Sequence, residues 1–195
     1  MSAGMRLTHT VAGILVELAE RQAADLGVPM AIAVVDSEGG LQLFKRMDGT
    51  LPVSTELAVS KAYTAAVLRM PTHQVGELAQ PGKALYGIQH THNGRIILFG
   101  GGYPLCIGDT VVGAIGVSGG SVEQDMQVAQ PAVNLFQDVQ RWAQELKELL
   151  PSVAHNSAQP AAVKDSLMRA LAAIEPQVPE DTVAALTGGV LLALS

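Results

Sequence analysis

Two histidines separated by a single residue, His90 and His92, are the first side chains of this sequence that suggest chemistry. Alternate residues of a strand project to the same side, so the pair could share a metal ion. Neither a carboxylate nor a third histidine stands nearby in sequence, and Asn93-Gly94 directly after them predicts a turn. The pattern therefore favours exposed histidines at a turn over a metal site.

A second candidate is a glycine series, Gly113, Gly116, Gly119 and Gly120, that joins a predicted strand to a predicted helix. Its spacing fits neither the dinucleotide-binding pattern nor the P-loop pattern. A helix that starts behind two glycines still presents N–H groups that can hold an anion or a carboxylate. In the alternative interpretation, Gly113 and Gly116 let a helix press against the strand, and Gly119-Gly120 make the turn.

His9 lies at the N-terminal turn of the first predicted helix and is followed by an apolar helix face. A histidine with apolar surroundings and no carboxylate partner suits axial ligation of the iron of a tetrapyrrole. The competing interpretation is a histidine at a helix start that faces water. The sequence leaves both interpretations open.

The remaining polar candidates stand near predicted loop or helix ends: Asp36, Lys61, Arg69, Glu77 and Glu123. They form no recognisable triad, acid–base pair or metal cluster. An enzymatic alternative places a pocket between the sheet and the helix start at Gly119-Gly120. A small organic acid or an aldehyde-derived metabolite would bind there, and Asp36, Arg69 or Glu123 would supply its polar contacts.

The helices that must position these residues are predicted from apolar periodicity and from capping residues. Thr8 or Thr10 caps the first, and Ser121 with Gln124 has the spacing of a capping box at the start of the last. Pro131 should mark a kink or a break in that last helix. The expected ranges are the first helix toward residue 27, then 55–68, 74–79 and 121–150.

Five strands are expected between these helices, in the overall order α-ββ-α-α-βββ-α. Successive strands joined by tight turns make antiparallel pairs, so the prediction is an α+β fold with helices packed on an antiparallel sheet. The predicted strands cover residues 30–35, 41–47, 95–99, 105–107 and 110–118.

Composition narrows the classes of partner. The 195 residues carry a net charge of −6 and only 4% aromatic residues, which argues against a nucleic-acid surface. The single cysteine, Cys106, excludes an internal disulfide and is interpreted as a buried small hydrophobe rather than a nucleophile. No segment is apolar and long enough to span a membrane. The expected location is the cytoplasm.

The character of the chain changes after residue 150. Residues 151–162 are rich in Pro, Ser, Ala and Gln and predict a linker, and an amphipathic helix is expected over 164–174. We therefore predict one domain over residues 1–150 and a tail over 151–195.

Several segments taken together resemble one family. AIAVVDSEGGLQLFKRMDG, the ELAQPG segment and GAIGVSGG followed by VEQD are similar to the GlcG/HbpS family, which also supplies the C-terminal domain of PduO-type corrinoid adenosyltransferases. The resemblance covers about residues 5–145.

The resemblance implies a profilin-like fold with an antiparallel five-stranded sheet flanked by helices. It also implies homo-oligomers, often tetramers or octamers, and haem as the cofactor, with His9 at the place of a haem-ligating histidine. Some members belong to glycolate or propanediol operons, the latter linked to bacterial microcompartments. The tail over 151–195 resembles peptides that tether cargo to microcompartment shells, or it covers a neighbouring subunit.

Overall fold

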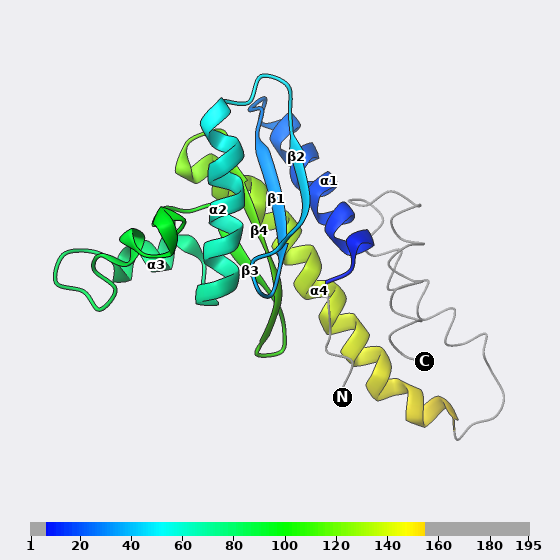
Figure 1. Cartoon of the computed structure of the whole chain (residues 1–195). Helices are drawn as coiled ribbons and strands as arrows, with labels where there is room; N and C mark the ends of the chain where they lie inside the picture. The colour runs from blue at the N-terminus through cyan, green and yellow to red at the C-terminus, as the bar shows by residue number, and fades with distance from the viewer. Residues whose placement is uncertain (1–6, 155–195) are drawn as a thin grey trace. The chain divides into compact units, whose positions relative to one another are not determined.

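The computed structural model of the chain describes residues 7–154, with side chains as far as Arg141 (Figure 1). The chain divides into two units, residues 1–137 and 138–195, and all strands described belong to the first. The predicted division at residue 150 stays a prediction. None of the described helices is both long and apolar enough to cross a membrane.

The sheet has four antiparallel strands in the order β2-β1-β4-β3. Their bounds are β1 Ala31–Asp36, β2 Leu41–Arg46, β3 Gly102–Ile107 and β4 Thr110–Ser118. Tight turns join β1 to β2 and β3 to β4, as the sequence predicts. The expected α+β class with an antiparallel sheet is therefore confirmed.

The fifth predicted strand, over residues 95–99, is wrong: no strand lies there in the described part of the chain. The backbone N–H of Ile97 donates to the side-chain oxygen of Thr64, at 3.0 Å, rather than to a neighbouring strand. The carbonyl oxygen of Leu98 lies against Gly76, only 1.9 Å from where a Cβ there would be. The segment is thus held against two helices and stays outside the sheet.

The described residues form four α-helices: α1 His9–Asp25, α2 Pro52–Leu68, α3 Thr72–Leu78 and α4 Val122–Ala154. Thr8 caps α1, and its side chain accepts a hydrogen bond from the N–H of Val11. The capping box of α4 is confirmed, because Ser121 and Gln124 each accept from the other's backbone N–H. Pro131 does not break α4, which is one continuous helix.

The last predicted boundary also shifts. The last helix continues beyond the expected residue 150, since α4 includes Pro151 and ends at Ala154. The remainder of the predicted tail, including the helix expected over 164–174, lies outside the described residues.

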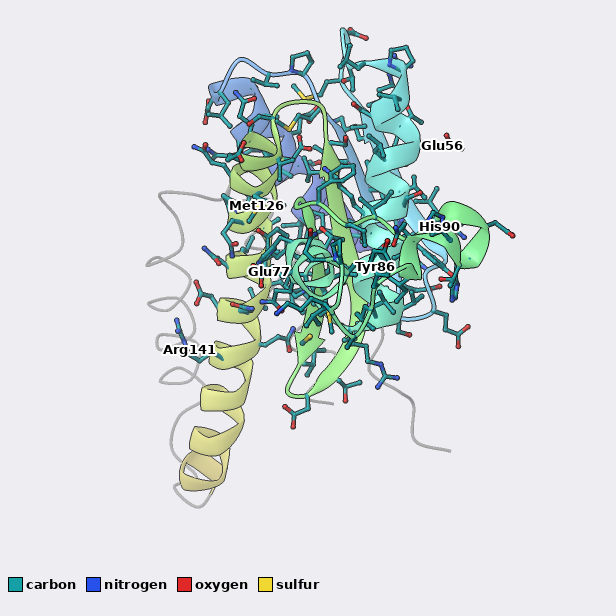
Figure 2. The ribbon with its side chains drawn as sticks, turned by 90° about the vertical axis from the view of Figure 1, so that its left-hand side faces the viewer. Glu56, Glu77, Tyr86, His90, Met126 and Arg141 are labelled. Carbon is teal, nitrogen blue, oxygen red and sulfur yellow. The ribbon has the colours of Figure 1, made fainter. Side chains whose placement is uncertain are left out.

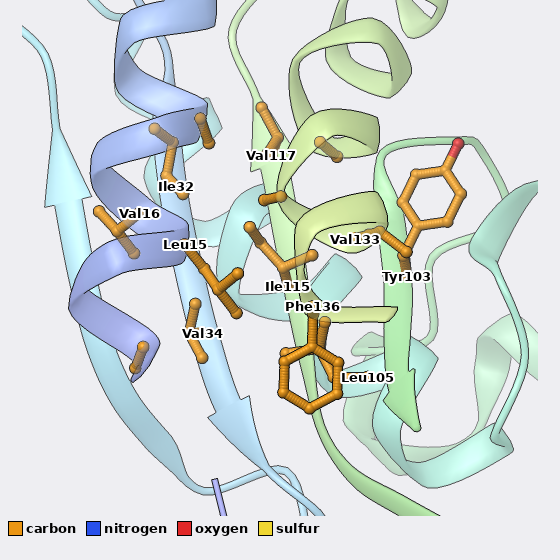
Figure 3. Packing of buried hydrophobic residues seen from close by; sticks show 14 of the residues in the cluster. Leu15, Val16, Ile32, Val34, Tyr103, Leu105, Ile115, Val117, Val133 and Phe136 are labelled. Atoms are coloured by element: carbon orange, nitrogen blue, oxygen red, sulfur yellow. The ribbon is translucent and has the colours of Figure 1, made fainter. Parts of the chain in front are cut away.

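The two faces of the sheet carry different side chains, because successive residues of a strand point to opposite faces. Ile32 and Val34 of β1 pack in a large core with residues of α1 and α4 (Figure 3). The alternate residues Ala31, Ala33 and Val35 pack against the alanines of α2. Small residues on this second face let α2 lie close to the strands.

Gly116 shows how close that approach is. A Cβ on Gly116 would lie 2.1 Å from the carbonyl oxygen of Ala58 and 2.5 Å from the backbone nitrogen of Ala62, both on α2. A Cβ on Gly113 would lie 2.8 Å from the Leu7 side chain on the other face. The close helix packing expected at Gly116 is therefore confirmed, whereas a Cβ on Gly113 would meet the Val35 carbonyl oxygen, at 2.5 Å, and Leu7, which stands before α1.

Candidate functional site

His9 is the first residue of α1, and its side chain is exposed. One helical turn later stands Gly13, where an added Cβ would meet no atom within 4 Å. Residues four apart share a helix face. His9 therefore shares a helix face with position 13, where no bulky side chain stands.

His90 and His92 do not converge on one point. The Nε2 of His90 lies 3.3 Å from the side-chain nitrogen of Gln89, whereas the Nδ1 of His92 shares a 2.8 Å hydrogen bond with the hydroxyl of Tyr63. Both histidines are exposed on the connection between α3 and β3, from which His90 and Tyr86 project in Figure 2. Within residues 7–141, no three side chains of the metal-binding types gather into a metal site.

The helix start at Gly119-Gly120 is already occupied by the protein itself. The N–H groups of both glycines donate to Oδ1 of Asp125, each at 3.0 Å. Asp125 is nearly fully buried, and its carboxylate takes the place that an external anion would need. The expectation that these two N–H groups hold a ligand is therefore wrong.

The second oxygen of Asp125 binds a buried lysine of α2. Lys61 donates to Oδ2 of Asp125 at 2.5 Å and to the carbonyl oxygen of Val117 at 2.9 Å. The Lys61 side chain is 0% exposed, and its Nζ lies 5.1 Å from the ring centroid of Phe99. Burial lowers the pKa of the Lys61 ammonium group, although the neighbouring Asp125 carboxylate acts in the opposite direction.

We call Lys61, Asp125, Gly119 and Gly120 the Lys61–Asp125 network. It joins α2, on one face of the sheet, to the first turn of α4, on the other. Since its donors bind protein acceptors and its ammonium group is shielded from solvent, the network serves structure rather than catalysis.

The sequence marks Lys61 only as one of several polar residues near loop or helix ends, and it does not predict the pairing of Lys61 with Asp125. The two residues are 64 positions apart, so no local spacing connects them. One signal was available: Lys61 stands among the alanines of a helix face, next to Ala62 and three residues after Ala58. A lysine on such a face needs a buried partner.

Asp36 has a local structural role. Its Oδ1 accepts from the backbone N–H groups of Glu38, at 2.9 Å, and Gly40, at 2.8 Å, within the turn between β1 and β2. A short acidic side chain that binds the backbone in this way favours a turn. Asp36 is thus bound to its own turn.

The predicted pocket residues are not brought together. Asp36 pairs with Gly113 at one end of β1, whereas Ser118, next to Gly119, pairs at the other end. Arg69 is an exposed residue that ends α2. The geometry therefore does not supply the single pocket that the enzymatic alternative requires.

Glu123 is exposed on the first turn of α4. Hydrogen bonds from its own backbone N–H and from the Ser121 hydroxyl lower the pKa of its carboxyl group. Cys106 is a half-buried free thiol, and burial together with Asp109 raises its pKa, as expected of an unreactive cysteine.

Comparison with known proteins finds one matching family. The model of the family described as haem degrading protein HbpS-like matches residues 7–134. A 15.0 kDa protein from the dhaT-dhaS intergenic region of Citrobacter freundii is 41% identical over 133 residues, covering 68% of this chain and 94% of that protein.

Two further similar proteins are a corrinoid adenosyltransferase and a solved haem complex. The corrinoid adenosyltransferase PduO of Salmonella typhimurium is 43% identical over 119 residues, which are 61% of this chain but only 35% of PduO. The solved structure of a PduOC:heme complex is 40% identical, with a TM-score of 0.65, and covers 67% of this chain and 94% of that chain.

Proposed function

Because this chain belongs to the HbpS-like family, we propose that it is a haem-binding protein in which His9 supplies an axial ligand. The observation that carries the proposal is the 40% identity to PduOC, whose solved structure is a complex with heme and is covered over 94% of its length. The match to PduO spans about a third of that enzyme, so corrinoid adenosylation is not proposed for this chain.

The surroundings of His9 fit a flat ligand on an open surface. Its imidazole is exposed and has no hydrogen-bond partner among the described residues. Gly13, one turn along α1, leaves space above the helix backbone. A free imidazole nitrogen is a common axial ligand of haem iron, and bound haem would add a redox-active metal. The role of the protein residues is to bind and orient that group.

A haem titration tests the proposal. We expect the purified full chain to produce a shifted Soret band and the His9→Ala variant to produce a different spectrum. His90→Ala is the matched control, because it also removes an exposed histidine, and it should behave as wild type. Identical spectra for wild type and His9→Ala would remove His9 from the role. Absence of any shifted band would contradict haem binding itself.

We further propose that the chain forms a homo-oligomer, a tetramer or an octamer. Large apolar side chains on the surface support this, since such groups mark protein interfaces where they gather. The largest exposed fractions belong to Leu41, Leu51, Val53 and Tyr86. Light scattering coupled to gel filtration should give a mass several times 20.3 kDa. A monomer mass at micromolar concentration would contradict the proposal.

The third proposal concerns location: a cytoplasmic protein, within a bacterial microcompartment where one is present. The Pro- and Ala-rich segment and the amphipathic stretch after it, within residues 155–195, support a tether to shell or enzyme partners. Removing residues 155–195, which leaves α4 intact, should abolish co-localisation with the shell. If the shortened chain still co-localises but loses its oligomeric mass, the tail covers a neighbouring subunit instead.

A further inference from the structure

Three side chains meet at a point on α2 that the proposed haem site does not use. The hydroxyl of Tyr63 shares its 2.8 Å hydrogen bond with Nδ1 of His92, and the guanidinium carbon of Arg95 lies 3.8 Å from the centroid of the Tyr63 ring. We call Tyr63, His92 and Arg95 the Tyr63 cluster. It lies on the α2 side of the sheet, whereas His9 begins a helix on the opposite face (Figure 1).

The backbone beneath the cluster is strained. His92 and Asn93 have positive φ angles of 50° and 56°, and Gly94 follows at 78°. The Asn93-Gly94 turn is as predicted, but a third consecutive left-handed residue is not needed for it. Left-handed non-glycine residues cost about 1–3 kcal/mol each, and such strain gathers at functional sites.

Rigid contacts with α2 hold this backbone in place. The side-chain hydroxyl of Thr64 donates to the carbonyl oxygen of Arg95, at 3.2 Å, and accepts from the N–H of Ile97, at 3.0 Å. The turn between β1 and β2 makes room for the Tyr63 ring, since a Cβ on Gly39 would lie 2.4 Å from it. These contacts with α2 hold the connection that carries His92 and Arg95 in one position.

The local charge is the reverse of the charge of the whole chain. The net charge of the protein is −6, yet no Asp or Glu stands in the sequence between Glu77 and Asp109. Four Lys, Arg or His residues lie in that span: Lys83, His90, His92 and Arg95. The span therefore supplies a locally positive surface.

Two carboxylates sit in the adjacent turn between β1 and β2, Asp36 and Glu38. Asp36 is bonded to the N–H groups of its own turn. Neither forms an ion pair with Arg95, and no other carboxylate does so within residues 7–141. The Arg95 guanidinium therefore keeps hydrogen-bond donors available.

We propose that His92 and Arg95 form a binding site for a small anion of the carboxylate or phosphate class. Stacking on Tyr63 fixes the plane of the Arg95 guanidinium, which can bind two oxygens of one anion with its fork of N–H groups. The cation over the ring strengthens the Tyr63 hydroxyl as a donor, so it donates to Nδ1 of His92. The proton of the imidazole then sits on Nε2, which donates to the same anion.

Titration of the full chain with inorganic phosphate, and separately with acetate, tests the site. Imidazole signals of histidine-labelled protein report on His92, which is assigned from the His92→Ala spectrum. We expect saturable shifts of the His92 signal with at least one of the two anions. Phosphate alone, acetate alone or both would define the ligand class. If neither phosphate nor acetate moves that signal at tens of millimolar, the proposal is overturned.

Variants then separate a built site from general surface charge. Arg95→Gln should weaken the affinity by about tenfold or more, because a bidentate charged contact is lost. Arg21→Gln, an exposed arginine on α1 with the same change in charge, should leave the affinity unchanged. Tyr63→Phe keeps the stacking ring but removes the hydrogen bond to Nδ1 of His92, and it should weaken binding only a few-fold. Equal affinities for Arg95→Gln and Arg21→Gln would show non-specific attraction and overturn the site.

Discussion

Lys61 and Tyr63 stand two residues apart on α2 and hold opposite kinds of polar cluster. Lys61 is fully buried, and its ammonium group binds Asp125 and a backbone carbonyl. Tyr63 lies nearer the surface and contacts His92 and Arg95, which are both exposed. A polar cluster whose donors are satisfied inside the protein stabilises the fold, whereas a positioned cluster with donors left over can bind something else.

The largest expected effect falls on the buried cluster. Asp125→Ala should lower the free energy of unfolding by about 3–5 kcal/mol, because it leaves a buried ammonium group uncompensated. Glu20→Ala is the control: its ion pair with Lys45 has the same 2.5 Å length, but the side chains are 30% and 45% exposed. That variant should cost at most about 1 kcal/mol. Urea denaturation measures both free energies of unfolding. Equal losses for the two variants would contradict the claim that the buried ion pair stabilises the fold more than the exposed one.

The next largest loss of stability is expected from substitutions of glycines that have positive φ angles. Gly101 has a φ of 110°, and a Cβ there would lie 2.7 Å from the Val117 carbonyl oxygen and 2.8 Å from Nζ of Lys61. Gly101→Ala should therefore lower the free energy of unfolding by about 2 kcal/mol or more. Gly39→Ala, at a φ of 84°, displaces only the Tyr63 ring and should cost less while impairing the response of His92 to anions. The reverse order in thermal denaturation would contradict the assignment of roles.

The two partners of the buried pair should also differ from one another. Lys61→Met leaves the Asp125 carboxylate with its bonds from Gly119 and Gly120, whereas Asp125→Ala removes three partners at once. We expect Lys61→Met to cost about 2 kcal/mol less than Asp125→Ala, since it retains two hydrogen bonds that contribute about 1 kcal/mol each. A larger loss for Lys61→Met would show that the ion pair outweighs the bonds to the glycines.

The smallest effect on stability belongs to the exposed cluster. Tyr63→Phe removes one hydrogen bond at the surface and should change the free energy of unfolding by less than about 1 kcal/mol. Denaturation of this variant and of Asp125→Ala under one set of conditions measures the contrast directly. A loss of several kcal/mol for Tyr63→Phe would make the Tyr63 cluster a structural element as well.

Local patterns predict much of this fold. The hairpins and the capping box at Ser121 depend on neighbours in sequence, and the close packing at Gly116 depends on a single strand–helix contact. The predicted strand over 95–99 fails because the N–H of Ile97 donates to the side chain of Thr64, a tertiary contact across 33 residues. An apolar run alone does not reveal such a partner.

The candidate sites depend still more on tertiary contacts. Gly119-Gly120 has the sequence of an anion-binding helix start, but Asp125 fills it, and Lys61 reaches Asp125 from another helix. Likewise, the bond between Tyr63 and His92 spans 29 residues. In each case, the partner that decides the role of a residue stands outside its local motif.

The most direct test of haem binding through His9 is chemical rescue of the His9→Ala variant. Wild-type protein with one equivalent of haem should give the shifted Soret band, and His9→Ala should lose it. Added imidazole should restore the wild-type spectrum in the variant, since it replaces the missing ligand at the space the alanine leaves. A wild-type spectrum in His9→Ala without imidazole would contradict ligation by His9.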